Sequence, residues 1–126
     1  MESPLVWAYI GDAVFELFIR VELLNTSKAK PNKLHFESIK MVSAKAQNNI
    51  LEEIENIFTD DEKDIVRKGR NAKPKTFAKN ASVKEYLKAT GFEALIGYLF
   101  LTKQNERLDE ILNYIKREYF DKNIDL

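Results

Sequence analysis

Two long apolar stretches of the chain each contain an acidic residue, and this pattern restricts the fold more than any other feature. Asp12 lies within residues 5–19, and Glu93 lies within residues 90–101. A stretch that is apolar on nearly all sides is typical of a helix buried in a protein core. A carboxylate there is costly unless it is paired, hydrogen-bonded or bound to a metal ion. The sequence therefore predicts an acidic site between two core helices.

Each of these predicted helices also contains a glycine, Gly11 in the first and Gly97 in the second. Glycine inside a helix costs about 1 kcal/mol relative to alanine. A close approach of the two helices, or access to backbone near the acids, would explain both positions. Either glycine taken singly could also be a tolerated helix residue.

The remaining helices are indicated by start signals and by apolar residues at helical spacing. Pro4 suits the first position of a helix, Ser43 suits a cap, and Thr59–Glu62 and Ser82–Glu85 have the form of capping boxes. Helices are expected over residues 4–24, 33–41, 43–58, 59–69, 82–102 and 105–119. Since no segment alternates as a strand does, we expect an all-α domain of about six or seven helices over residues 1–126.

Composition excludes several kinds of chemistry. The formal net charge is zero, there is no cysteine, and His35 is the single histidine. Disulfides, thiolate zinc sites, cysteine nucleophiles and Ser-His-Asp triads are therefore not expected within one chain. The apolar runs are interrupted by acids and are too short for a membrane span, and no leader peptide is evident. These features indicate a cytoplasmic protein that does not associate with membranes.

Oxygen ligands without histidine or cysteine favour Mg²⁺ or Mn²⁺ over zinc. Asp12 and Glu16 are four residues apart and share a helix face. If their helix packs against that of Glu93, three carboxylates can converge on an ion that activates water and stabilises phosphoryl transfer. Alternatively, Glu16 pairs with Arg20 one turn on, which is the better interpretation for Glu16 taken singly, and Asp12 acts as a cap or pairs internally.

Residues 67–84 contain seven basic side chains and no acid. Asn71 and Asn80 add groups that can contact phosphate and sugar oxygens. Phe77 is the only aromatic residue of this segment, which disfavours stacking on single-stranded bases and suits the backbone of a duplex better. The alternative is a solvated basic loop.

Large aromatic side chains are numerous for a small core. Ordinary core packing accounts for most of them, but some are expected to form a subunit interface. They include Trp7, Tyr9, Phe15, Phe18, Phe92, Tyr98 and Phe100.

Four short motifs carry a resemblance to a known family. Residues 9–16, Tyr-Ile-Gly-Asp-Ala-Val-Phe-Glu, resemble the signature helix of the ribonuclease III catalytic domain, and residues 92–97, Phe-Glu-Ala-Leu-Ile-Gly, resemble its second acidic motif. With residues 42–47, residues 69–73 and the length of the chain, the resemblance is to Mini-ribonuclease III, a ribonuclease III domain without a double-stranded-RNA-binding domain. It extends over almost the whole chain.

The resemblance implies an all-α, homodimeric endonuclease that uses Mg²⁺ to cut both strands of double-stranded RNA, with Mn²⁺ as a substitute. It makes residues 1–126 a ribonuclease III catalytic domain. Asp12 and Glu93 fall on the family's catalytic, metal-binding acids, and Tyr9 falls on an aromatic residue that packs across the dimer. Two further acids of other ribonuclease III enzymes are replaced here by Ala8 and Thr90, so this site has fewer carboxylates.

In this interpretation the basic segment holds the RNA. Its expected contacts are Arg70, Asn71, Lys73, Lys75 and Lys79. The resemblance also implies maturation of the precursor of large-subunit (23S) ribosomal RNA, and leaves open whether a ribosomal protein assists. The rival hypothesis is a non-catalytic helical module that binds double-stranded RNA or associates with the ribosome. Two acids kept in apolar helices argue against it.

Overall fold

A computed structural model describes residues 3–26, 43–72 and 83–120, and every regular element in these ranges is helical. The elements are the α-helices α1 (Pro4–Thr26), α3 (Ala44–Ile54), α4 (Asp60–Asn71), α5 (Val83–Leu101) and α6 (Asn105–Ile115), the 3₁₀ helix η1 (Glu55–Ile57) and the π-helix η2 (Lys116–Phe120). The expectation of an all-α fold is confirmed. The helix expected over residues 33–41 and the cap expected at Ser82 lie outside the described residues.

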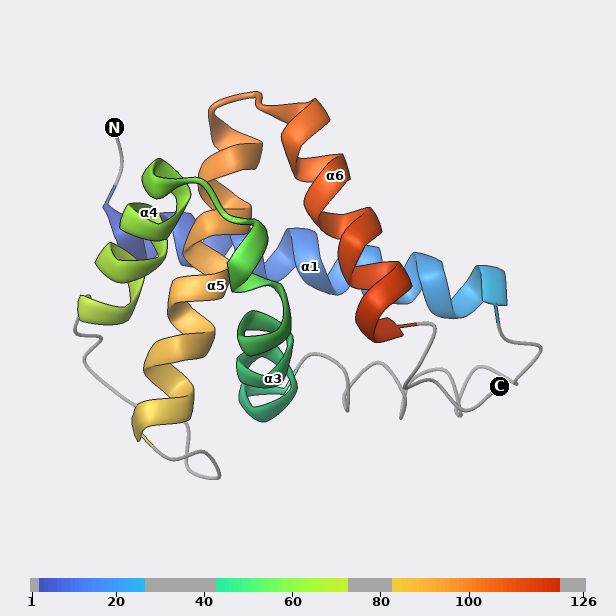
Figure 1. Cartoon of the computed structure of the whole chain (residues 1–126), viewed down its shortest axis with the longest axis horizontal. Helices are drawn as coiled ribbons and strands as arrows, with labels where there is room; N and C mark the ends of the chain where they lie inside the picture. Colours follow the sequence, from blue (N-terminus) through green and yellow to red (C-terminus); the bar gives the residue numbers. More distant parts are fainter. Residues whose placement is uncertain (1–2, 27–42, 73–82, 121–126) are drawn as a thin grey trace.

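Helix α5 is the central element of the arrangement (Figure 1). It crosses α1 and also packs against α3 and α4, while α6 returns from its end after a short turn. Lys103, in that turn, has a positive φ of 59°, and Thr102 closes the end of α5 by donating from its Oγ1 to the carbonyl of Tyr98 at 2.7 Å. The two helices that carry the predicted acids are therefore direct neighbours.

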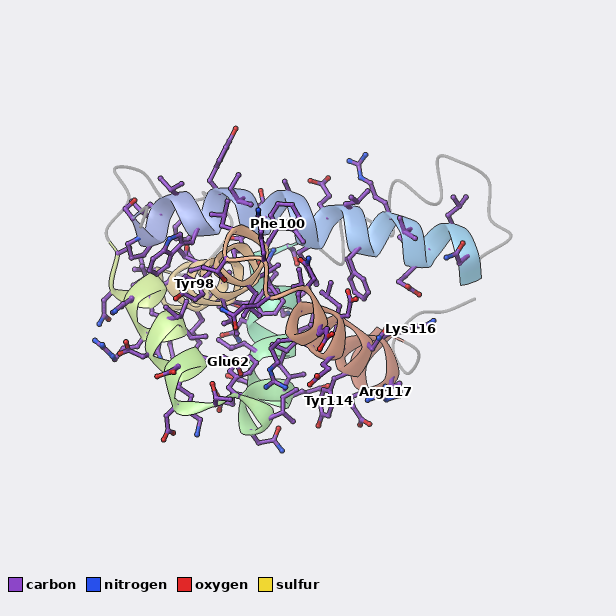
Figure 2. The ribbon with its side chains drawn as sticks, turned by 90° about the horizontal axis from the view of Figure 1, so that it is seen from above. Glu62, Tyr98, Phe100, Tyr114, Lys116 and Arg117 are labelled. Atoms are coloured by element: carbon purple, nitrogen blue, oxygen red, sulfur yellow. The ribbon has the colours of Figure 1, made fainter. Side chains whose placement is uncertain are left out.

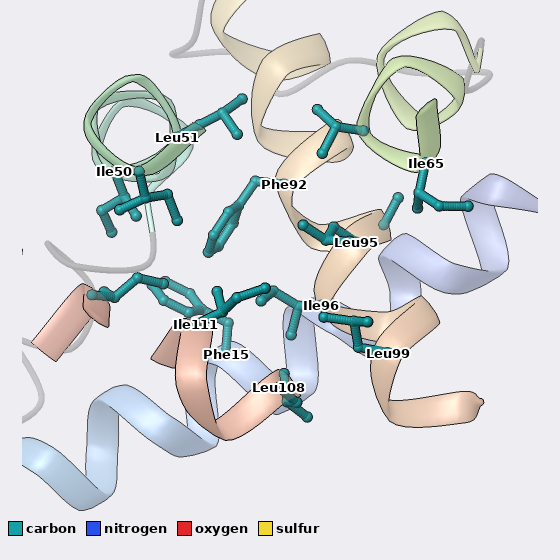
Figure 3. Close-up of a cluster of buried hydrophobic side chains, with 14 of the residues drawn as sticks. Phe15, Ile50, Leu51, Ile65, Phe92, Leu95, Ile96, Leu99, Leu108 and Ile111 are labelled. Atoms are coloured by element: carbon teal, nitrogen blue, oxygen red, sulfur yellow. The ribbon is translucent and has the colours of Figure 1, made fainter. Parts of the chain in front are cut away.

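The core lies between these helices (Figure 3). Phe15 of α1 and Phe92 of α5 are fully buried and meet edge to face, with ring centroids 5.0 Å apart. Edge-to-face aromatic pairs add about 1 kcal/mol to the free energy gained by burial alone. Aliphatic side chains from α3 and α6 close around the pair, among them Ile50, Ile54, Ile111 and Ile115.

Capping side chains fix the starts of α3 and α4. The Ser43 Oγ accepts from the Ala46 amide at 3.1 Å. At α4 the Thr59 Oγ1 accepts from the Glu62 amide at 3.1 Å, and the Glu62 carboxylate accepts from the Thr59 amide at 2.9 Å. Both caps were predicted from the sequence, and both are confirmed. Each such cap contributes about 1 kcal/mol to helix stability.

Three predicted helix ends need correction, and one is that of α6, which ends at Ile115 and continues as η2 rather than running to residue 119. Helix α3 ends at Ile54 and continues as η1, rather than running to Phe58. Helix α4 does not end near Gly69 but runs to Asn71. Gly69 lies inside α4 because it faces Gly91 of α5, where a Cβ on Gly69 would come within 2.8 Å of the Gly91 Cα. The glycine serves a close helix crossing and not a helix end.

An ion pair joins α4 to α6. Glu62, labelled in Figure 2, is buried and receives two hydrogen bonds of 2.8 Å from the Arg107 guanidinium. Arg107 also donates to the Ile57 carbonyl at 2.8 Å. Burial opposes ionisation of Glu62, but the hydrogen bonds from Arg107 and Thr59 outweigh it, and the pKa of Glu62 lies below its ordinary value. The pair therefore holds α6 against α4.

None of the helices in the described ranges combines the length and the apolarity that a membrane span needs.

Candidate active site

Two glycines bring α1 and α5 into backbone contact. A Cβ placed on Gly11 would lie 1.7 Å from the carbonyl oxygen of Glu93, and one placed on Gly97 would lie 1.7 Å from the carbonyl oxygen of Trp7. No side chain fits at either position without separating the helices. The close approach that the sequence predicted for Gly11 and Gly97 is confirmed.

The crossing places the two predicted acids side by side. Asp12 directly follows Gly11 and is exposed, whereas Glu93 is partly buried. Burial, and then a hydrogen bond and the like charge from Asp12, raise the pKa of Glu93 to about 9. Two adjacent carboxylates repel each other unless a proton or a cation lies between them. At neutral pH Glu93 therefore keeps its proton, and the pair carries one negative charge unless a cation replaces that proton.

A third side chain reaches the pair from α3. The Gln47 Nε2 donates to the Glu93 Oε2 at 3.3 Å. Gln47 is 2% exposed, so it is one of the few polar residues in the described core. Gln47 was not predicted to be a functional residue, although it lies within the motif of residues 42–47. Its position on the buried face of α3 was the signal that could have identified it.

Glu16 does not join the acidic site. Its Oε1 accepts from the Arg20 guanidinium at 2.7 Å, one helical turn along α1, as the sequence predicted for Glu16 taken singly. Within the described ranges, no three acidic or histidine side chains are grouped so as to hold a metal ion. The convergence of three carboxylates considered from the sequence is therefore not found there, because the i, i+4 cation holds Glu16 on the helix surface.

The other predicted functional residues lie on the surface or outside the described residues. Tyr9, on α1, is 78% exposed. Arg70 and Asn71 are exposed at the carboxyl end of α4. Lys73, Lys75 and Lys79 fall in a part of the chain that the structure does not describe.

Two hollows between the described helices lie away from the acid pair. A hollow of about 600 Å³ lies between α4, α5 and α6, over the ion pair of Glu62 and Arg107, and its lining includes neither Asp12 nor Glu93. Another of about 420 Å³ lies between α3 and α4, again without the two acids. Because Asp12 is exposed at the helix crossing, the acid pair is open to solvent on the side of Asp12.

The all-α fold agrees with comparisons to known proteins. Residues 5–104 match the family model described as Ribonuclease III domain. The match includes both acids and most of the chain. The protein therefore belongs to the ribonuclease III family of endoribonucleases.

Relatives place it within one branch of that family. Mini-ribonuclease 3 of Staphylococcus aureus is 49% identical over 115 residues, which cover 90% of this chain and 86% of the relative. Mini-ribonuclease 3 of Clostridium tetani is 46% identical over 118 residues, covering 93% of this chain and 78% of the relative. A crystal structure of a Fusobacterium nucleatum protein superimposes with a TM-score of 0.80 at 34% identity, covering 92% of this chain and 93% of the other. The branch is that of the Mini-ribonuclease 3 proteins.

Proposed function

We propose that this protein is a Mg²⁺-dependent endoribonuclease that cleaves double-stranded RNA, with Asp12 and Glu93 as its catalytic and metal-binding residues. The observation that carries the proposal is the pairing of these two carboxyl groups at the crossing of Gly11 and Gly97. Membership of the ribonuclease III family supports the reaction class. Mn²⁺ is expected to substitute for Mg²⁺, since both accept hard oxygen ligands.

The residues present suit a divalent cation. Asp12 and Glu93 are oxygen donors, and the pKa of about 9 for Glu93 reflects a site that disfavours a second negative charge. A cation between the carboxylates would remove that penalty without a proton. When bound, Mg²⁺ supplies a water of lowered pKa and positive charge opposite the phosphate.

The protein contributes the geometry of the site. Asp12 is exposed, so a phosphodiester of a duplex can reach it. Glu93 is held by the hydrogen bond from Gln47 and by the surrounding core. Backbone contact between α1 and α5 leaves little room for the carboxyl groups to separate. Such preorganisation lowers the cost of assembling the charged site during reaction.

We also propose that the protein acts as a homodimer through α1. This helix lies along one edge of the described helices (Figure 2) and exposes large apolar side chains at helical spacing. Tyr9 is 78%, Leu17 64% and Leu24 67% exposed, and Val6 and Val21 continue the row. An apolar row of this length is typical of an isologous interface.

The basic segment is proposed to hold the RNA backbone. Arg70 and Asn71 are exposed at the end of α4, as this role requires. Lys73, Lys75 and Lys79 extend the same run of basic residues along the sequence. Contacts of this kind bind phosphate without regard to base sequence.

We further propose that residues 1–126 act as one ribonuclease III catalytic domain in the cytoplasm, on the precursor of large-subunit (23S) ribosomal RNA. Helix α6 lies beyond the matched residues 5–104, yet Leu108, Ile111 and Ile115 are buried in the same core, which supports one domain.

The test is cleavage of a labelled RNA duplex with and without Mg²⁺. Wild-type protein should cut both strands only with the metal ion. Asp12→Asn and Glu93→Gln should each abolish cleavage but keep RNA binding, because they remove charge without changing shape. Glu16→Gln, on the same helix, is the matched control and should remain active, since its charge is paired with Arg20.

The alternative, a non-catalytic RNA-binding module, predicts binding without cleavage in every condition. Retained cleavage by Glu93→Gln in Mg²⁺ would contradict the proposed site while leaving the family membership intact.

A further inference from the structure

We propose that Gln47 is a positioning residue, whose side-chain amide holds the Glu93 carboxylate in the orientation that binds the metal ion. The inference rests on the proposed function of Glu93. Gln47 does not touch the substrate in this view; it acts through Glu93.

Gln47 is buried on a face of α3 that is otherwise apolar. Helix α3 directs one face into the core, formed by Ala46, Gln47, Ile50, Leu51 and Ile54, and Gln47 is the only polar member of that face. Burying an amide without a hydrogen-bond partner costs about 1–3 kcal/mol in proteins relative to an apolar residue. An amide at this position therefore indicates a partner that needs it.

The partner is Glu93. The Gln47 Nε2 lies 3.3 Å from the Glu93 Oε2, and the two residues are 46 positions apart in sequence and on different helices. Because a carboxylate oxygen can accept more than one interaction, this hydrogen bond fixes the plane of the carboxyl group and leaves oxygen lone pairs for a cation. Outer partners of this kind orient metal ligands and maintain their geometry.

The chemistry of an amide also fits the site. A lysine or arginine would neutralise the carboxylate and compete with a cation for it. Another carboxylate would add repulsion to a pair that already disfavours two negative charges. The amide of Gln47 donates a hydrogen bond and carries no net charge, so it orients Glu93 without altering the charge available to the ion.

Local structure fixes the donor in turn. The Gln47 backbone amide donates to the Ser43 carbonyl at 3.0 Å, and the Ser43 Oγ caps the preceding turn through Ala46. Gln47 therefore projects from the anchored first turn of α3. An anchored donor can restrict Glu93 more than a donor on a fraying helix end could.

The test compares Gln47→Met with wild type. Methionine has nearly the same length and volume but no amide donor. As a matched control, Asn49→Met makes the same kind of exchange at an exposed position of α3. The first readout is binding of Mn²⁺ to RNA-free protein, followed by the loss of its free-ion paramagnetic resonance signal. The second is the Mg²⁺ concentration that half-saturates cleavage, and the third is the melting temperature in EDTA.

We expect Gln47→Met to weaken Mn²⁺ binding by about tenfold or more, and to raise the half-saturating Mg²⁺ concentration by a similar factor. Maximal cleavage at saturating Mg²⁺ should fall much less. Asn49→Met should behave as wild type. Gln47→Asn keeps the amide but shortens the side chain by one methylene, so it should also weaken Mn²⁺ binding. This variant provides the test if Gln47→Met does not fold.

Unchanged Mn²⁺ affinity in a folded Gln47 variant would overturn the inference, whether or not its melting temperature falls, because a purely structural role moves only the latter. This outcome leaves the proposed function standing. If wild-type protein binds no Mn²⁺ and cuts no duplex, the proposed function itself fails, and this inference fails with it.

Discussion

The Cα of Gly11 lies so close to α5 that a methyl group on it would stand 1.7 Å from the carbonyl oxygen of Glu93. Asp12 follows Gly11 in the sequence, and Glu93, which Gly11 contacts, is the other acid of the candidate site. One crossing therefore both sets the distance between α1 and α5 and brings the carboxyl groups together. Fold and site depend on the same contact.

Alanine at this crossing should disrupt the protein. Gly11→Ala or Gly97→Ala would place a methyl group against backbone carbonyl atoms, which cannot move as a side chain can. Overpacking of ordinary core positions costs about 1–3 kcal/mol, and we expect at least the upper end here. Thermal unfolding followed by circular dichroism measures the loss, and Asn49→Ala, at an exposed helical position, is the control. A melting temperature within a degree of wild type for Gly11→Ala would show that the helices can separate freely.

The stability of metal-free protein should fall as pH rises. Glu93 keeps its proton up to a pKa of about 9 in the folded state, against 4.5 for an ordinary glutamate in the unfolded chain. Between these values the folded state binds the additional proton, so the free energy of unfolding decreases with increasing pH. Melting temperatures in EDTA across this range should show the decline.

Glu93→Gln provides the comparison for that experiment. It cannot ionise, so its melting temperature should change less with pH and should exceed that of wild type near pH 9. Added Mg²⁺ should stabilise wild-type protein most at high pH, where the carboxylate is charged, and should have little effect on Glu93→Gln. An identical pH profile for the two proteins would mean that Glu93 ionises normally.

A charge on the exposed face of α1 should split the dimer. Tyr9→Asp would place an unpaired carboxylate in an apolar interface, which is unfavourable without a partner. Sedimentation velocity at micromolar concentration should show a dimer for wild type and a monomer for Tyr9→Asp. Because Tyr9 is 78% exposed within one chain, the variant should still fold. Fully active wild-type protein that sediments as a monomer would refute the dimer. Asn49→Asp, which adds the same charge at another exposed position, is the control for Tyr9→Asp and should remain a dimer.

Removal of the basic side chains should weaken RNA binding without removing catalysis. The variant replaces four residues by alanine: Arg70, Lys73, Lys75 and Lys79. The salt dependence of duplex binding should fall by about one unit in slope for each phosphate that the variant no longer neutralises. Cleavage at saturating RNA should decrease less than affinity, since these residues are not the proposed metal ligands.

A control for the quadruple variant removes four other exposed cations: Lys45, Lys63, Lys103 and Arg117. It changes the net charge equally but leaves the proposed RNA-binding side chains in place, so its salt slope should stay nearer that of wild type. Equal effects of the two quadruple variants would show that general charge, and not this segment, binds the RNA.

The local features of the fold were well predicted from the sequence. Ser43 and Thr59 cap helices as their side chains suggested, because capping depends on residues within one turn. Gly69 was misinterpreted as a helix end, since a glycine near a helix terminus and a glycine at a helix crossing look alike in one dimension. Only the position of Gly91 on α5 distinguishes them.

The sequence by itself determined that Asp12 and Glu93 lie in apolar helices and are costly there, because polarity and helical period are properties of neighbouring residues. It did not determine their partners. The pairing of Glu16 with Arg20, one turn apart on α1, was predicted from the sequence, but the hydrogen bond from Gln47 to Glu93, 46 positions away, depends on how α3 and α5 pack. Hydrogen bonds and charge repulsion act over a few ångströms in space, whatever the separation along the chain. Only the tertiary structure could therefore decide which side chains on different helices interact.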